Sequence, residues 1–206
     1  MQDTGLAWRQ DVSRETLDRL EVFVDLLMRW NARINLVAKS SVDEVWNRHV
    51  RDSLQLADLA PQQISRWVDM GTGGGFPGLV IAIARADSFA PDTVHLIESD
   101  QRKSAFLREA ARLTGVKVVV HAKRIEAVED LSADVVSSRA LAPLDQLCGH
   151  AARLLRDGGL ALFPKGATWQ AEVDTARVSW NFDLTAHPSV TSQEAAILAL
   201  KGISHV

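Results

Sequence analysis

Apolar residues near the N-terminus recur at intervals of three, four or seven positions: Leu17, Leu20, Val24, Leu27 and Ile34. This spacing is typical of an amphipathic helix. Ser13 is a good N-cap just before it, so the pattern predicts a helix over residues 14–33. A second helix is expected to follow Ser41 and to run toward Leu59, because Pro61 cannot continue it. The first 60 residues are therefore expected to be helical.

Beyond residue 60 the pattern changes to short apolar runs, which are typical of buried strands: 67–70, 94–97, 116–120, 134–137 and 160–163. Segments with helical spacing lie between several of these runs, at 77–86, 101–114 and 143–156. Such alternation predicts a parallel, doubly wound sheet, to which 182–184 and 197–200 are expected to add edge strands. We expect an N-terminal helical extension over residues 1–60 and an α/β domain over residues 61–206.

The composition is that of an ordinary globular domain, with 206 residues of which 47% are hydrophobic and 24% are charged. The single cysteine, Cys148, excludes an intrachain disulfide and a Cys-rich metal site, and its place in a predicted helix suggests a core position. Residues 1–3 lack the features of a signal peptide, and no run reaches the roughly 18 apolar residues of a membrane span. We expect a cytoplasmic monomer that has no metal and no membrane association.

The formal net charge of −3 argues, taken alone, against a nucleic-acid partner, because phosphate binding relies on Lys and Arg. The charges are unevenly distributed, however. Residues 1–28 carry three basic and six acidic side chains, whereas residues 101–124 carry seven basic side chains and one acidic one. This cationic segment keeps RNA open as a partner, although a solvated helix face would have the same composition.

The most informative segment lies between a predicted strand and a predicted helix: Asp69-Met70-Gly71-Thr72-Gly73-Gly74-Gly75-Phe76-Pro77-Gly78. Glycines after the first strand of a doubly wound fold let the backbone approach a ligand. From Gly73 the segment fits the dinucleotide pattern G-x-G-x-x-G, and from Asp69 it fits the acid-x-Gly-x-Gly-x-Gly pattern of S-adenosylmethionine-dependent methyltransferases. A carboxylate at the strand end disfavours a pyrophosphate but could receive the ammonium of a methionine moiety, directly or through water. We therefore expect Asp69, Gly71 and Gly73 to contact S-adenosylmethionine, with a ligand-free turn as the alternative.

Two further segments suit a nucleoside. Glu98 ends the next predicted strand, where an acidic side chain can accept hydrogen bonds from ribose hydroxyls. Lys123-Arg124-Ile125-Glu126 follows the third predicted strand, at the level expected for an adenine ring, whose face Ile125 could cover. Both observations fit S-adenosylmethionine and a dinucleotide equally well.

These residues carry a family resemblance. The loop 69–78 is followed by Arg124-Ile125-Glu126, Ser138-Arg139-Ala140 and Pro164-Lys165-Gly166, and is preceded by Asn35-Leu36 and Arg48-His49-x-x-Asp52-Ser53. In this order, over about residues 14–166, the motifs resemble the ribosomal RNA small subunit methyltransferase G family, also called RsmG or GidB. The resemblance implies a Rossmann-like, seven-stranded, mostly parallel methyltransferase fold with an N-terminal helical extension.

The resemblance also implies an activity and its site. Members of this family transfer a methyl group from S-adenosylmethionine to nitrogen 7 of a guanine in 16S ribosomal RNA, near the decoding region of the small ribosomal subunit, and release S-adenosylhomocysteine. By similarity, the cofactor contacts are Gly71, Phe76, Ile125, Glu126 and Arg139. The sequence departs from the common pattern at Gly74, Phe76 and Glu98, and residues 193–196 lack the basic residue expected near the last strand.

The residues agree with this chemistry. Nitrogen 7 of neutral guanine carries a free lone pair, so no general base is required and orientation supplies most of the acceleration. Arg139 could hold the methionine carboxylate or an RNA phosphate, and Lys165 is a candidate phosphate contact. His49 and Asp52 would share a helix face, either lining the substrate entrance or capping the packing of the extension. A nicotinamide-dependent oxidoreductase and a non-catalytic RNA-binding protein remain as alternatives.

Overall fold

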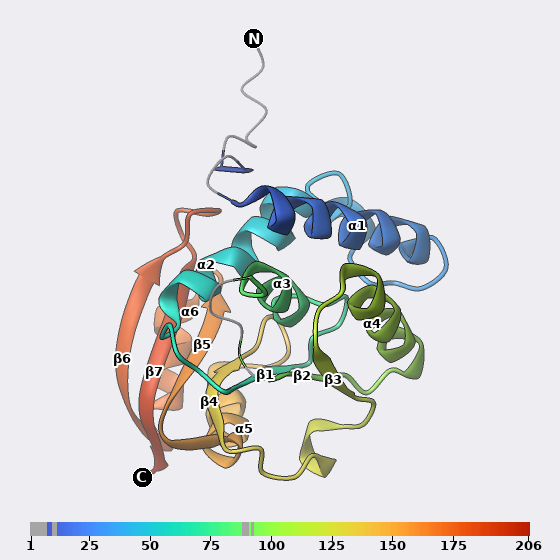
Figure 1. The fold of residues 1–206 in the computed structure, drawn as a ribbon. Coiled ribbons are helices and arrows are strands. Elements are labelled where there is room, and N and C mark those ends of the chain that lie inside the picture. Colours follow the sequence, from blue (N-terminus) through green and yellow to red (C-terminus); the bar gives the residue numbers. More distant parts are fainter. Residues whose placement is uncertain (1–7, 10–11, 88–90, 92) are drawn as a thin grey trace.

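The computed structural model of the chain describes residues 8–9, 12–87, 91 and 93–206. Residues 1–3, on which the expectation about a signal peptide rests, lie outside the described residues. Seven strands form one sheet in the order β3-β2-β1-β4-β5-β7-β6, seen in Figure 1. Their bounds are β1 Arg66–Met70, β2 Thr93–Ile97, β3 Val118–His121, β4 Ala133–Ser137, β5 Leu155–Lys165, β6 Trp180–Pro188 and β7 Ala196–His205.

The sheet is parallel from β1 to β5, whereas β7 is antiparallel to both β5 and β6. The prediction of a seven-stranded, mostly parallel sheet is therefore confirmed. Because β7 lies between β5 and β6, the order differs from the 3-2-1-4-5-6 arrangement of dinucleotide-binding sheets.

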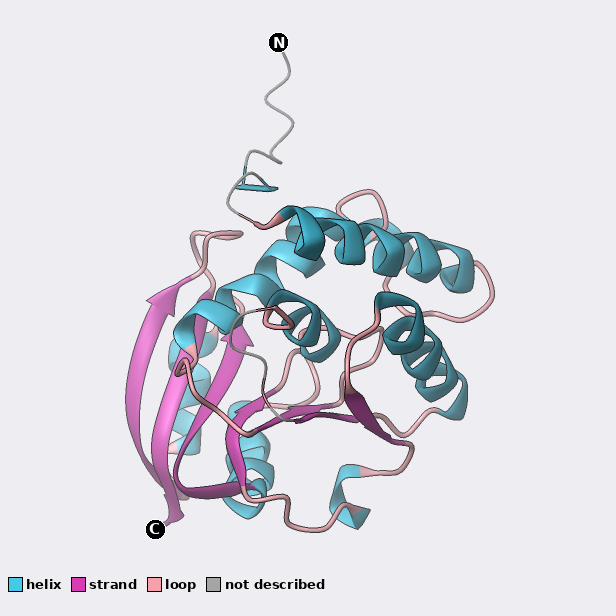
Figure 2. Cartoon of the chain, in the orientation of Figure 1, coloured by secondary structure: helices cyan, strands magenta, loops and turns pink. Residues whose placement is uncertain are grey.

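Helices cover both faces of the sheet (Figures 1 and 2). One face carries α1 Arg14–Asn31, α2 Asp52–Leu59, α3 Gly78–Ala84 and α4 Gln101–Thr114, and the other carries α5 Leu144–Leu154 and α6 Trp169–Ala176. Cys148 of α5 is fully buried, which confirms its predicted core position. Helix α4 has the bounds predicted from its spacing, and its N-cap Asp100 accepts hydrogen bonds from the Arg102 and Lys103 amides.

The N-terminal extension shares its core with the sheet domain. Ser13 caps α1 by accepting a hydrogen bond from the Thr16 amide at 3.1 Å, as expected. Phe23 on the buried side of α1 is fully buried and packs against Phe76 and Phe106, with ring centroids 5.3 and 6.2 Å apart. Burial of this apolar face, which is the main source of helix stability in proteins, therefore fixes α1 on the sheet domain.

The second predicted helix, from Ser41 to Leu59, is wrong as a single α-helix. The chain forms a 3₁₀ turn at Lys39–Ser41, a π-helix at Val45–Arg51 and only then α2. The Ser41 hydroxyl donates a hydrogen bond to the Ala38 carbonyl at 2.9 Å, and such a local bond competes with helix formation. The wider π-helical segment precedes Asp52, and π-helical turns are frequent at functional sites.

Candidate functional site

A cavity of about 1300 Å³ lies at the carboxyl ends of the parallel strands, where ligands bind in open α/β sheets. One part, here called the β1–β3 lobe, is lined by Gly71–Gly74, Ile97, Glu98 and Lys123–Glu126. The other, called the β4–β7 lobe, is lined by Arg139–Pro143, Pro164–Gly166, Glu172 and parts of the β6–β7 turn, with His49 and Asp52 from the extension. The cavity therefore brings together nearly all of the residues singled out from the sequence.

The glycine loop forms the floor of this cavity. Gly71 has φ +67°, a conformation that favours glycine, and a Cβ placed there would lie 2.6 Å from Leu141 Cδ1. A Cβ on Gly78 would lie 2.5 Å from Leu96 Cδ2 and 2.6 Å from Asp69 Cβ. Glycine is thus required twice, once for backbone conformation and once for close packing of α3 on the sheet.

Asp69 lies near the end of β1, beneath the glycine loop. It is fully buried and does not line the cavity. Its carboxylate accepts hydrogen bonds from the Ser137 hydroxyl at 2.7 Å and from the Gly78 amide at 2.9 Å. Burial raises the pKa of Asp69 to about 6, although the hydrogen bonds from Ser137 and Gly78 oppose the increase. Asp69 therefore organises the loop from below, and its expected contact with the ammonium of a methionine moiety, directly or through water, stays a prediction.

This bond also bears on the dinucleotide alternative. A pyrophosphate would use free backbone amides at the start of the helix after the loop. The Gly78 amide, at the first residue of α3, is already bonded to a carboxylate. The loop is thus poorly suited to the pyrophosphate of a nicotinamide cofactor.

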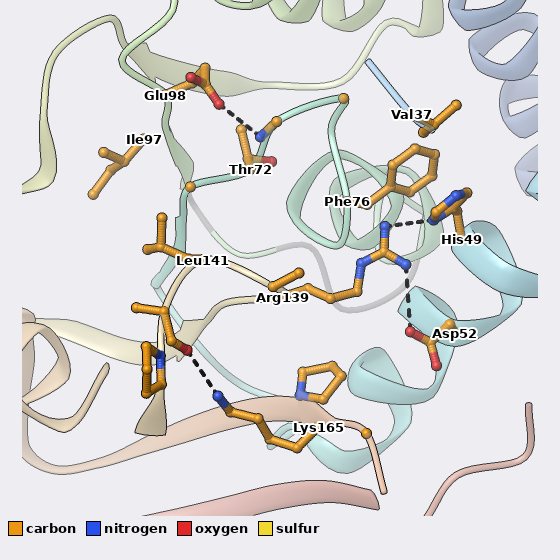
Figure 3. A pocket seen from close by; sticks show the side chains of 18 of the residues that line it. Val37, His49, Asp52, Thr72, Phe76, Ile97, Glu98, Arg139, Leu141 and Lys165 are labelled. Atoms are coloured by element: carbon orange, nitrogen blue, oxygen red, sulfur yellow. Dashed lines mark hydrogen bonds and ion pairs between the residues drawn. The ribbon is translucent and has the colours of Figure 1, made fainter. Parts of the chain in front are cut away.

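Glu98 lies at the end of β2 in the β1–β3 lobe. One carboxylate oxygen accepts from the Gly73 amide at 3.0 Å and the other from the Asp100 amide at 2.8 Å. These bonds fix the side chain beside the glycine loop, and Figure 3 shows Glu98 with the bond to the loop as a dashed line. Each oxygen keeps a further lone pair, so Glu98 can still accept hydrogen bonds from ligand hydroxyls.

The turn after β3 closes the same lobe. Ile125 is 9% exposed and begins a 3₁₀ turn at Ile125–Ala127, while Glu126 is exposed at the rim. Arg153 of α5 donates to the Ile125 carbonyl at 2.7 Å. A partly buried arginine on α5, a helix that packs in the same apolar cluster as Ile125, thus fixes the apolar wall that was expected beside an adenine ring.

Arg139 joins the two lobes and is held on several sides. Its guanidinium donates to the Arg48 carbonyl at 3.0 Å and to His49 Nδ1 at 2.7 Å, and lies 3.6 Å from an Asp52 carboxylate oxygen. It also lies over the Phe76 ring, 5.2 Å from the centroid (Figure 3). The structure therefore brings Arg139 together with Phe76 and with the neighbouring residues His49 and Asp52, from three segments that are far apart in the sequence.

His49 accepts from Arg139 through Nδ1, so its ring proton lies on Nε2, which is 2.9 Å from the Ser41 hydroxyl. Burial and the nearby Arg139 and Arg48 charges lower the pKa of His49 to about 4. The imidazole is consequently neutral at pH 7, and it serves as an acceptor for Arg139. This arrangement fits both earlier alternatives for His49, because the residue lines the cavity and also ties down the extension.

Sequence reasoning missed two contributors. The β6–β7 turn reaches α2, where the Thr191 hydroxyl donates to Asp52 at 2.9 Å and the Val190 amide donates to Gln55 at 2.8 Å. Glu172 comes from α6, a helix that was not predicted. No local motif marks either feature, although a helical spacing between Trp169 and Ala176 could have suggested α6.

Lys165 ends β5 and is largely buried, with 10% of its side chain exposed. Its ammonium donates to the Ala142 carbonyl at 2.9 Å and to Glu172 at 2.7 Å. These bonds occupy the group that was expected to contact an RNA phosphate. Lys165 therefore supports the 140–143 loop, in which Ala140 has φ +54°.

Within the part of the chain that the structure describes, no group of three or more His, Cys, Asp or Glu side chains could hold a metal ion. Among the same residues, no helix is both long and apolar enough to span a membrane.

Comparison with known proteins settles the family. The family model of rRNA small subunit methyltransferase G matches residues 16–200. The chain is 52% identical over 197 residues to the ribosomal RNA small subunit methyltransferase G of Ruegeria sp. (strain TM1040), covering 95% of each protein. The chain belongs to this family. A second relative, of the same name, from Rhodospirillum centenum, is 52% identical over 193 residues and covers 94% of this chain and 87% of its own.

Solved structures show the fold of this methyltransferase. A putative O-methyltransferase from Klebsiella pneumoniae matches with a TM-score of 0.61 at 18% identity, covering 97% of this chain and 95% of its own. M. jannaschii TYW2 in complex with AdoMet matches with a TM-score of 0.57 at 15% identity, covering 85% of this chain and 80% of its own. The predicted methyltransferase fold is thereby confirmed.

Proposed function

We propose that this enzyme transfers a methyl group from S-adenosylmethionine to nitrogen 7 of a guanine in 16S ribosomal RNA, near the decoding region, and releases S-adenosylhomocysteine. Family membership over residues 16–200 is the observation that carries the proposal. The cavity supports it, because residues suited to a nucleoside and the residues of the β4–β7 lobe line the same cavity as the glycine loop. An in-line transfer needs two such neighbouring binding regions.

The β1–β3 lobe fits S-adenosylmethionine. The Glu98 carboxylate can accept hydrogen bonds from the ribose hydroxyls. Ile125 can pack against the adenine ring, and Glu126 lies at the rim of the cavity. Gly73 leaves room for close approach of the ligand to the backbone, because a Cβ there would meet only the Gly71 carbonyl oxygen, at 3.9 Å. Gly71 and Phe76 line the cavity beside it. When bound, the cofactor supplies an activated methyl group on a sulfonium.

The residues of this chain act mainly by positioning. Guanine nitrogen 7 needs no deprotonation, and the neutral His49 is engaged by Arg139 and Ser41. Arg139 stands at the boundary of the lobes, where it can meet the carboxylate of the methionine moiety or an RNA phosphate. Holding two reactants close together and in the right orientation lowers the activation barrier by about 7–11 kcal/mol in favourable cases.

The substrate proposal includes the partner and the location. Lys123 and Arg124 are exposed at the rim of the cavity, where they can contact RNA phosphates and outweigh the overall charge of −3 locally. A ribosomal substrate implies a cytoplasmic enzyme. We further propose a monomer in which residues 1–60 extend a methyltransferase domain of residues 61–206, and light scattering would test the oligomeric state.

A deletion strain tests the proposal. Loss of the gene should abolish 7-methylguanosine near the decoding region of 16S rRNA, and the wild-type gene should restore it. Persistence of the modification in the deletion strain would refute the assignment. Calorimetric titration separates the alternatives, since NAD binding without S-adenosylmethionine binding would favour an oxidoreductase, and RNA binding without methyl transfer would favour a non-catalytic binder.

A further inference from the structure

Glu172 is a carboxylate of the cavity wall with one oxygen still available. Its Oε2 accepts from the Leu144 amide at 3.0 Å and from Lys165 at 2.7 Å. Among the described residues, none donates to Oε1. Since the side chain is 26% exposed and lines the β4–β7 lobe, this second oxygen is open to a ligand.

The other carboxylates of the cavity are engaged differently. Asp52 accepts from Thr191 and faces Arg139 with its second oxygen. Glu98 uses both oxygens on backbone amides in the β1–β3 lobe, and Glu126 is exposed at the rim of that lobe. Glu172 is therefore the carboxylate with a free oxygen in the β4–β7 lobe, within the described part of the chain.

Guanine presents the matching chemistry. Its 2-amino group and N1–H are hydrogen-bond donors, whereas nitrogen 7 lies on the opposite, major-groove edge. A base that turns nitrogen 7 toward the cofactor must turn its 2-amino group away from it. A carboxylate at that far end would accept from the amino group and would repel adenine, which lacks it and presents an acceptor at N1.

The spacing of the sheet agrees with this orientation. The glycine loop follows β1, and Lys165, which holds Glu172, ends β5 two strands farther along. Adjacent strands lie about 4.8 Å apart, so these ends are separated by roughly 10 Å, which is enough for a purine placed edge-on. In Figure 3, Leu141 and Arg139 lie between the Glu98 side of the cavity and Lys165.

We propose that Glu172 selects guanine by accepting a hydrogen bond from its 2-amino group, with Lys165 and the Leu144 amide as the groups that position the carboxylate. The inference rests on the proposed function and names the specificity determinant of that same site. The ion pair with Lys165 also explains how the charged Glu172 carboxylate can be held in a partly buried place. Because Lys165 and the Leu144 amide both donate to Oε2, Oε1 is left for the base.

The substitution Glu172→Gln gives a sharp test. Both Lys165 and the Leu144 amide donate toward Oε2, so the amide oxygen of Gln should occupy that position and its NH₂ should point into the lobe. A donor would then face the 2-amino donor of guanine. Inosine lacks the 2-amino group but keeps N1–H, O6 and nitrogen 7, so small subunits reconstituted with inosine at the target position isolate this contact.

Wild-type enzyme should methylate the guanine substrate roughly 10- to 100-fold faster than the inosine substrate in kcat/KM, the range for one hydrogen bond to a charged group. In Glu172→Gln the ratio should fall to about one or reverse. Asp174→Asn, at an exposed position of the same helix, is the matched control and should keep the wild-type ratio.

Equal rates of wild type on guanine and inosine, or an unchanged ratio in Glu172→Gln, would overturn the inference. Absence of transfer by wild type to the guanine substrate would instead contradict the proposed function. Thermal unfolding checks that the variant is folded. If it is not, the double variant Lys165→Gln/Glu172→Gln, which leaves no unpaired charge, is measured in the same way.

Discussion

The buried carboxylate of Asp69 gives a prediction about stability. Burial raises its pKa from 3.8 to about 6 in the folded protein, so the folded state holds the proton more tightly than the unfolded chain does. Stability that this group contributes is fully present below about pH 4 and is lost as the pH rises through about 6. Asp69→Asn removes the titration. It keeps the shape, because an amide can still accept from Gly78 and donate to the Ser137 hydroxyl oxygen.

The magnitude follows from linkage. One pKa unit corresponds to about 1.4 kcal/mol, so the full effect is about 3 kcal/mol, of which about 2 kcal/mol falls between pH 4.5 and pH 7.5. The free energy of unfolding of wild type should therefore decrease relative to that of Asp69→Asn by about this amount over that range. Subtracting the free energy of unfolding of Asp69→Asn from that of wild type at each pH cancels the contribution of histidines and surface carboxylates, which titrate in both proteins.

Urea unfolding of both proteins at several pH values between 4.5 and 7.5 provides the measurement. Asp174→Asn serves as a surface control and should remain within about 0.5 kcal/mol of wild type. A difference between wild type and Asp69→Asn that does not change with pH, or that changes in the opposite direction, would refute the assignment of a raised pKa to Asp69.

Three further predictions concern the site. The Cβ that Gly78→Ala introduces would overlap Leu96 and Asp69. The variant should therefore lose about 1–3 kcal/mol of stability and bind S-adenosylmethionine more weakly in calorimetry. Wild-type affinity would contradict the packing argument. Arg139→Ala should reduce methyl transfer roughly 100-fold with an unchanged circular dichroism spectrum, and wild-type turnover would remove Arg139 from the site. RNA binding should weaken with salt, and Lys123→Gln should reduce the slope of log K against log salt by about one, so an unchanged slope would place Lys123 outside the interface.

The sequence was informative where function imposes a local pattern. The glycine loop, the strand-end Glu98 and the 123–126 turn all lie at the predicted sheet edge, because the carboxyl ends of parallel strands meet there. Helix α4 has the bounds predicted from its spacing, and in the structure Asp100 caps its start and Gly115 ends it in a left-handed conformation.

The parts that sequence reasoning missed depend on long-range contacts. The burial of Asp69 beneath its own loop requires Ser137 from β4, 68 residues away. Lys165 was predicted as a candidate phosphate contact, because its partner Glu172 lies on α6, a helix that was not predicted. The π-helical segment before Asp52 is similarly unmarked, because no residue preference distinguishes it from an α-helix. Motifs therefore located the cavity, but only the tertiary structure showed which side chains are already engaged.

The most direct test of the central claim is methyl transfer by the purified protein. Small subunits and free 16S rRNA from a strain that lacks the gene are incubated with S-adenosylmethionine labelled on the methyl group, and the RNA is digested for mass spectrometry. We expect one labelled nucleoside, 7-methylguanosine, at a single guanine near the decoding region in at least one of the two substrates. Label in a different nucleoside, or no label in either substrate, would contradict the account.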